Sequence, residues 1–163
     1  MYEEQELLDR AKNLAYFYLK IRPRTEKEIV DYLSKKKKRH KLTDEIIKKT
    51  VDSLKEEKLI DDKAFISWHV DRRSRAKPKS RMLLSQELIK HGVSRELVTY
   101  FFEDQPLEEE PLAKKALEPR WARWSHFPKD KRFQKAASFL QRRGFSYGVV
   151  KNTIAELEKT EYN

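Results

Sequence analysis

The sequence predicts an all-α protein, built as three tandem three-helix repeats in an elongated molecule whose curvature is left open. Only 3 of the 163 residues are glycine, too few for a βαβ nucleotide-binding fold or a turn-rich β-sandwich. Lys, Glu, Leu, Arg and Ala, all strong helix formers, are abundant. Apolar residues recur with helical spacing, and one helix–glycine–helix pattern occurs twice.

The helices of the first repeat are predicted from spacing and caps. Residues 7–22 carry apolar side chains at i, i+3, i+4 and i+7, and the proline that follows ends this helix. Thr25, with Glu three residues later, forms a capping box that opens a second helix. Thr43, followed by an acidic first turn, caps a third. Asp61 or Asp62 can cap a fourth, which begins the next repeat.

The later chain contains an internal repeat. Residues 88–98 match residues 140–150 in the order Leu, two spacers, a base, Gly, an apolar residue, Ser. Such a segment ends one helix at a glycine with positive φ and caps the next helix with Ser. Each occurrence follows a further predicted helix, over 62–76 and 112–124. We therefore predict three repeats, with residues 106–111 as a linker before the last: residues 7–60, 61–105 and 111–160.

Composition excludes several classes of function. The chain has no cysteine, which excludes a disulfide framework, a thiolate nucleophile and Cys-ligated zinc. The four histidines are scattered, and no nucleophile–base pair or paired-carboxylate motif is present, so we expect no enzyme, cofactor or metal. No apolar run approaches the ~18 residues of a membrane span, and the acidic N-terminus lacks a signal-peptide core. We expect a cytoplasmic monomer without membrane contact.

Three basic clusters are the main functional signal. The chain has 37 Lys and Arg against 27 Asp and Glu, a net charge of +10. Six bases lie within residues 72–81, eight within 120–143 and six within 35–41. Such clusters neutralise phosphates and give salt-dependent, sequence-tolerant binding, although a single cluster can equally be a solvated surface. The predicted contact residues are Arg72, Arg73, Arg75, Lys77, Lys79, Arg81, Arg132, Lys135, Arg142 and Arg143.

Two nucleic-acid-binding roles, a helix-turn-helix and base stacking by tryptophan, are alternatives to purely structural packing. A helix-turn-helix would place the helices after Ser94 and Ser146 in a major groove, but carboxylates on these helices would repel phosphates there. We therefore favour packing of consecutive repeats. Tryptophans can stack on bases. Trp68 lies on an apolar helical stripe, whereas Trp121 and Trp124 share a helical face beside Arg120 and Arg123, and we expect all three in the core.

Three segments match the motifs of one known family. Residues 24–29 (RTEKEI) with Leu33, residues 59–65 (LIDDKAF) and residues 139–146 (FLQRRGFS) occur in the family's order. They resemble, in turn, a first-repeat segment, the junction of the first two repeats, and the third-repeat signature of RecX proteins, modulators of the RecA recombinase. The last motif is the most specific, and the match extends over about residues 8–158. Ser80 stands where members often have glycine.

The resemblance implies a three-repeat helical protein that binds the RecA–DNA filament and restrains its strand exchange, ATP hydrolysis or extension. It implies no catalytic residue. We therefore expect an inhibitor of RecA in recombination and DNA repair, with the RecA filament and single- or double-stranded DNA as partners. The alternative is a general, sequence-tolerant DNA- or RNA-binding helical protein that acts without RecA.

Overall fold

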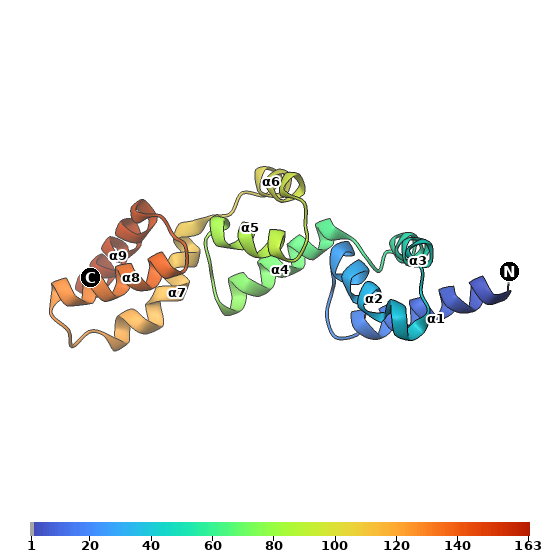
Figure 1. Ribbon diagram of the computed structural model, residues 1–163. Helices are drawn as coiled ribbons and strands as arrows, with labels where there is room; N and C mark the ends of the chain where they lie inside the picture. Colours follow the sequence, from blue (N-terminus) through green and yellow to red (C-terminus); the bar gives the residue numbers. More distant parts are fainter. Residues whose placement is uncertain (1) are drawn as a thin grey trace. The chain divides into compact units, whose positions relative to one another are not determined.

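Helices make up the fold in the part of the chain that the computed structural model describes, residues 2–163 (Figure 1). Among these residues there are nine α-helices and no strand, so the predicted all-α fold class is confirmed. In chain order they are α1 (Tyr2–Leu19), α2 (Glu26–His40), α3 (Asp44–Glu56), α4 (Asp62–Ala76), α5 (Arg81–Lys90), α6 (Arg95–Asp104), α7 (Glu109–Arg123), α8 (Lys129–Arg142) and α9 (Tyr147–Tyr162).

Some helix ends differ from the sequence prediction for local reasons. α1 ends at Leu19 rather than at residue 22, and a short turn separates it from Pro23. α7 begins at Glu109 rather than at residue 112, which places Pro111 in the first turn. Proline is tolerated there because its missing N–H has no partner within the helix. The predicted linker over 106–111 is therefore wrong in its last three residues.

The predicted caps are present at the first helices. The side-chain oxygens of Thr25 and Thr43 accept hydrogen bonds from backbone N–H groups three residues on, at 3.1 and 3.2 Å. Of the two aspartates at the start of α4, Asp61 is the cap, and it accepts in the same way at 3.1 Å. Asp62 instead accepts from the backbone N–H of Glu26 at 2.9 Å, and so ties the start of α4 to the start of α2.

The chain folds into two compact units, each with its own core. Unit 1 contains the residues up to 68 together with 88–98, and unit 2 contains 69–87 and 99–163. α1, α2 and α3 pack on one another around the unit 1 core, and α7, α8 and α9 around the unit 2 core. The repeat boundaries at 7–60, 61–105 and 111–160 stay a prediction.

Within unit 1, the turn after α5 packs against the start of α2. Gly92 has a φ of 97°, as predicted for a glycine that ends a helix. The Thr25 hydroxyl donates a hydrogen bond to the His91 carbonyl at 2.6 Å. A Cβ atom on Gly92 would lie 2.4 Å from the Cβ atom of Lys27, so the close approach also requires glycine.

The same arrangement recurs within unit 2. Gly144, after α8, has a φ of 85°, and a Cβ atom there would lie 2.4 Å from Ser80 Oγ and 2.5 Å from Leu83 Cγ. The Ser80 N–H donates to the Arg143 carbonyl at 3.0 Å, and Ser80 Oγ caps α5. In both units, therefore, a helix–glycine turn is seated on the N-terminus of a helix from an earlier part of the chain.

Candidate nucleic-acid interface

The basic strip predicted over residues 72–81 covers the end of α4 and the loop that leads to α5, within unit 2. Four of its bases are exposed and two are half-buried: Arg72, Arg75, Lys77 and Arg81 in the first group, Arg73 and Lys79 in the second. Arg75 pairs with Asp71 one turn earlier, at 3.1 Å, in an exposed contact that contributes little to stability. The guanidinium of Arg81 lies 5.3 Å from the ring centroid of Phe102.

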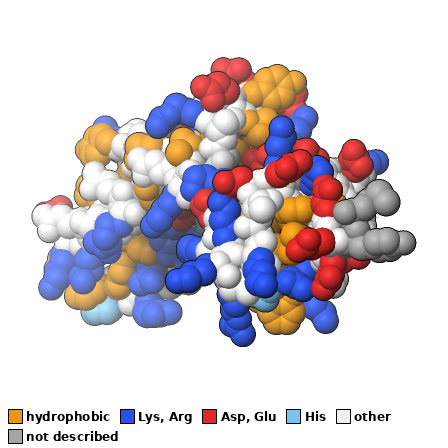
Figure 2. Space-filling view, turned by 45° about the vertical axis from the view of Figure 1, so that its right-hand side comes forward, with side chains coloured by type: hydrophobic (Ala, Val, Ile, Leu, Met, Phe, Trp, Pro, Cys, Tyr) orange, Lys and Arg blue, Asp and Glu red, His pale blue; other side chains and the backbone are white. Residues whose placement is uncertain are grey.

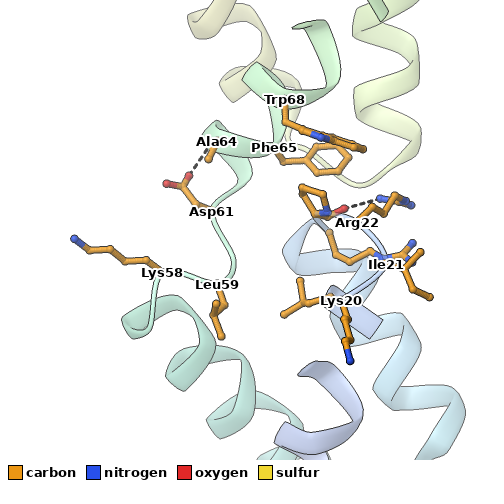
Figure 3. A pocket seen from close by; sticks show the side chains of 12 residues that line it. Lys20, Ile21, Arg22, Lys58, Leu59, Asp61, Ala64, Phe65 and Trp68 are labelled. Carbon is orange, nitrogen blue, oxygen red and sulfur yellow. Dashed lines mark hydrogen bonds between the residues drawn. The ribbon is translucent and has the colours of Figure 1, made fainter. Parts of the chain in front are cut away.

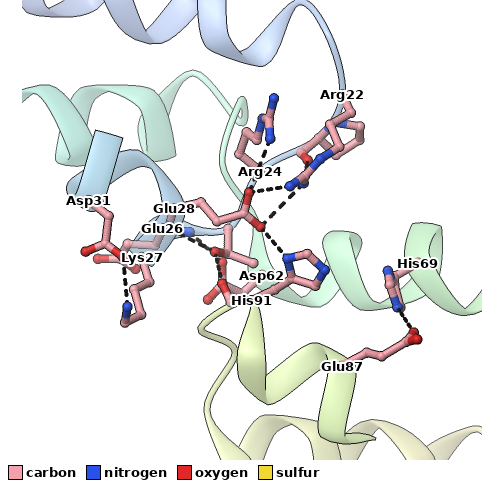
Figure 4. Close-up of polar contacts among 12 residues, drawn as sticks. Arg22, Arg24, Glu26, Lys27, Glu28, Asp31, Asp62, His69, Glu87 and His91 are labelled. Atoms are coloured by element: carbon pink, nitrogen blue, oxygen red, sulfur yellow. Dashed lines mark hydrogen bonds and ion pairs between the residues drawn. The ribbon is translucent and has the colours of Figure 1, made fainter. Parts of the chain in front are cut away.

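An acid from outside the strip pairs with both of its half-buried bases. Glu87, on α5, accepts a hydrogen bond from Arg73 Nε at 3.1 Å and pairs with Lys79. The same carboxylate lies 2.8 Å from Nε2 of the buried His69, a contact that Figure 4 shows. Arg73 and Lys79 therefore join α5 to α4 and its following loop, and the surface charge of the strip is smaller than its sequence indicates.

We expect Glu87→Gln to lower the free energy of unfolding by about 1–3 kcal/mol, because its buried partner and two bases lose their carboxylate. Burial raises the pKa of Glu87, but the hydrogen bonds from Lys79 and His69 and the charge of Arg73 outweigh it and hold the pKa below the ordinary value of a glutamate. The ionised carboxylate therefore stabilises the protein above its unfolded-state pKa, and this contribution disappears as the pH falls through the folded-state pKa.

Urea unfolding of the wild type and the Glu87→Gln variant at about pH 7 and about pH 3 checks this expectation. The difference in stability between the two proteins should be largest at neutral pH and should shrink in acid. A difference that is the same at both pH values would show that the Glu87 charge does not stabilise the fold.

A cavity of about 280 Å³ in unit 2 gathers five bases from three segments of the chain. Its cations come from the end of α4, from α7 and from the turn after α8: Arg75, Lys115, Arg120, Arg123 and Arg143. None of the residues that line it is acidic. Lys115 Nζ donates to the Ser74 carbonyl at 3.1 Å, and Arg143 Nη1 to the Pro78 carbonyl at 3.3 Å, which holds the segments together. We call this site the basic cavity.

The cations of the basic cavity are crowded. The guanidinium groups of Arg120 and Arg143 lie 4.6 and 5.0 Å from the centroid of the same Phe139 ring. Burial, and then the charge of Arg120, lowers the pKa of Arg143. An anion between like charges relieves their repulsion, and the planar fork of arginine matches the oxygens of a phosphate. The basic cavity is therefore suited to a backbone phosphate of nucleic acid.

Sequence reasoning found only part of this cavity. Arg75 and Arg143 were among the predicted contact residues, whereas Lys115, Arg120 and Arg123 were not. The available signal was the pair of arginines one turn apart on α7, which share a helical face. Tertiary packing decides which other segments lie against that face of α7. The sequence alone therefore does not show that the ends of α4 and α8 lie beside it.

The structure corrects the placement of Arg132. Its side chain is buried, and its guanidinium donates to Glu161 at 2.8 and 2.6 Å and to the Trp121 carbonyl at 2.6 Å. It also lies 3.6 Å from the centroid of the Trp121 ring. Arg132 thus joins α8 to α7 and α9, and these contacts engage its guanidinium inside unit 2. Glu161 is 29 residues away in sequence, so spacing gave no sign of this pairing.

Two of the three tryptophans are less buried than the sequence expectation. Trp121 is buried, as expected for a core residue. Trp68 and Trp124 are only half-buried, and each lines a pocket. Lys135 and Arg142, the remaining predicted contact residues, lie at the pocket of Trp124 in unit 2.

Unit 1 has an apolar groove of about 640 Å³ between the end of α1 and the start of α4 (Figure 3). Ile21 and Leu59, which line it, are 72% and 45% exposed, and Trp68 closes one side. Figure 3 shows Lys20 and Lys58 pointing outward from it. Nearby, Arg22, Arg24 and His91 surround the carboxylate of Glu28 (Figure 4), at N–O distances of 2.7, 3.5 and 3.0 Å. These bases are thus engaged within unit 1.

The described residues hold neither a metal site nor a membrane-spanning helix. Among them, no three His, Asp or Glu side chains are arranged to hold a metal ion. None of the helices between residues 2 and 163 combines the length and apolar character that a membrane crossing requires. On the face drawn in Figure 2, Lys and Arg side chains are spread widely, with acidic side chains among them.

Comparison with known protein families gives two matches. Residues 11–54 match the first three-helix domain of RecX, and residues 108–154 match its third three-helix domain. Together the two matches cover more than half of the chain. A regulatory protein RecX from Oceanobacillus iheyensis is 34% identical over 98% of this chain and 57% of its own length. One from Streptococcus mutans is 29% identical over 90% of this chain and 55% of its own length.

Solved structures of the same kind are similar to this fold. The crystal structure of RecX from Lactobacillus salivarius matches with a TM-score of 0.78 and 22% identity, over 94% of this chain and 98% of that chain. A second crystal structure, of a regulatory protein RecX, matches with a TM-score of 0.71 and 25% identity, over 94% and 74%. The chain spans just over half the length of the Oceanobacillus and Streptococcus relatives named above.

Proposed function

Because the chain belongs to the RecX family of regulatory proteins, we propose that it binds the RecA–DNA filament and restrains strand exchange and ATP hydrolysis in recombination and DNA repair. The observation that carries this proposal is the match to proteins named regulatory protein RecX over nearly the whole chain. The basic cavity supports it, since it offers five cations to a partner that displays phosphates.

A regulator of this kind acts by binding rather than by chemistry. A ligand shifts an equilibrium between two states of its partner by the difference in its affinity for them. Cations spread over several helices can contact several phosphates and acidic side chains of a filament at the same time. Binding therefore favours the filament state in which the spacing of those groups matches the spacing of the cations. The contacts we assign to this role are the exposed bases of the strip together with all five bases of the basic cavity: Arg72, Arg75, Lys77, Arg81, Lys115, Arg120, Arg123 and Arg143.

A second function is favoured by the same cavity. Phosphate recognition by clustered Arg and Lys needs no RecA, so a general nucleic-acid-binding role has the same chemical basis. In that case any effect on RecA would come only from covering the DNA.

Titration of RecA-dependent ATP hydrolysis on long single-stranded DNA separates the two functions. We expect the protein to slow hydrolysis at ratios to nucleotide that are too low to coat the DNA. Inhibition that begins only when the strand is saturated would support the general binding role and would contradict regulation through the filament.

A further inference from the structure

A second basic pocket in unit 2 is built around an aromatic side chain. It has a volume of about 380 Å³ and lies beside the turn between α7 and α8. The residues that line it are Trp124, Lys131, Gln134, Lys135, Ser138 and Arg142. Three of these six residues are basic and none is acidic. We call this site the aromatic pocket.

One side of the Trp124 ring packs against the core of unit 2. Its ring packs edge-on against Phe139 of the unit 2 core, with 6.4 Å between centroids and an interplanar angle of 80°. The indole is nevertheless only half-buried and borders the pocket. A ring that is already ordered loses little conformational entropy when a ligand packs on it.

The lysines of the pocket lie close to two aromatic rings, that of Trp124 in the pocket and that of Phe127, which is not one of its lining residues. Lys131 Nζ and Lys135 Nζ are each 4.9 Å from the ring centroid of Phe127, and Lys135 Nζ is 5.9 Å from that of Trp124. Arg142 is exposed on the same pocket. Exposed cation–π contacts of this kind are weak, and lysine stems are flexible, so the ammonium groups can move to a nearby anion.

We propose that the aromatic pocket binds an unpaired nucleotide of single-stranded nucleic acid, with its base stacked on Trp124 and its flanking phosphates paired with Lys131, Lys135 and Arg142. A nucleotide is the ligand that supplies both a π-face and adjacent phosphates. The bases of a duplex are already stacked on one another, so the pocket distinguishes single strands from duplexes. The inference rests on the proposed function for its choice of partner and adds the form of nucleic acid that is recognised.

The test compares three fluorescent ligands that carry equal numbers of phosphates, in the absence of RecA: a thymidine oligomer, the same backbone with abasic sites, and a duplex. For the full chain, we expect the thymidine oligomer to bind about fivefold or more tightly than the abasic strand. Trp124→Ala should remove this preference and leave duplex affinity within about twofold of wild type. Trp124→Tyr should restore most of the preference, since it returns an aromatic face.

Tryptophan fluorescence gives a second readout that does not depend on stability. The thymidine oligomer should quench the fluorescence of the wild type and of Trp68→Phe, the matched change at the half-buried tryptophan of unit 1. Trp124→Phe should bind the strand but lose the quenching. Equal affinity of the wild type for thymidine and abasic strands, or quenching that survives in Trp124→Phe, would overturn the proposal. Since RecA is absent from this test, such a result would leave the proposed regulation of RecA standing.

Discussion

Gly144→Ala should lower the free energy of unfolding by about 2–4 kcal/mol and the melting temperature by on the order of 10 °C. At a φ of 85° the backbone conformation is strained for alanine, whereas glycine adopts it readily. Its Cβ atom would also meet Ser80 Oγ at 2.4 Å and Leu83 Cγ at 2.5 Å, which forces the cap of α5 to move. Thermal unfolding followed by circular dichroism measures both quantities.

The other two glycines provide the comparison. Gly92→Ala should be destabilising for the same two reasons, since Gly92 has a φ of 97° and faces Lys27 at 2.4 Å. Gly148 lies in the first turn of α9, and the nearest atom to an added Cβ is 4.0 Å away, so Gly148→Ala should melt at or slightly above the wild-type temperature. If all three variants melted alike, the packing of helix–glycine turns on earlier helices would be wrong.

Charge reversal in the basic cavity should weaken binding to the RecA–DNA filament at least about tenfold, or about 1.4 kcal/mol. The variant replaces Arg75, Arg120 and Arg123 with Glu. All three side chains are exposed, and Arg75 makes only a weak surface pair with Asp71, so the fold should persist. With three fewer phosphate contacts, the slope of log affinity against log salt should become shallower by about two to three. Fluorescence anisotropy of labelled DNA in the filament, at several salt concentrations, gives both values.

A matched variant keeps the change in net charge and moves it elsewhere. Lys48, Lys90 and Lys151 are exposed and lie outside the basic cavity, on α3, α5 and α9. Their replacement by Glu should weaken binding far less and should leave the salt slope close to that of the wild type. Equal losses in the two variants would mean that overall charge, and not the cavity, governs binding.

Most of the fold could be predicted from the sequence because its signals are local. Apolar spacing, the caps at Thr25 and Thr43, and the glycine turns at Gly92 and Gly144 act within a few residues of chain. The sequence did not predict which residues each glycine turn packs against. The seating of Gly144 on Ser80 joins residues more than 60 apart, and it gives a structural reason for a small residue at position 80.

The candidate site could be predicted less completely, because it is formed by tertiary contacts. Charge runs correctly identified basic segments, but a run does not reveal which bases are already paired. Glu87 engages Arg73 and Lys79 from another helix, and Glu161 engages Arg132 from the end of the chain. The basic cavity likewise combines three segments, of which only two carried predicted residues.

RecA-dependent ATP hydrolysis at protein ratios too low to coat the DNA tests whether the protein regulates RecA through the basic cavity. The wild type, the Arg75/Arg120/Arg123→Glu variant and the Lys48/Lys90/Lys151→Glu variant are titrated in parallel, after circular dichroism shows that all three are folded. We expect the wild type and the lysine variant to inhibit alike, and the cavity variant to need at least about tenfold more protein for half-inhibition. Undiminished inhibition by the folded cavity variant would contradict regulation of RecA through the basic cavity.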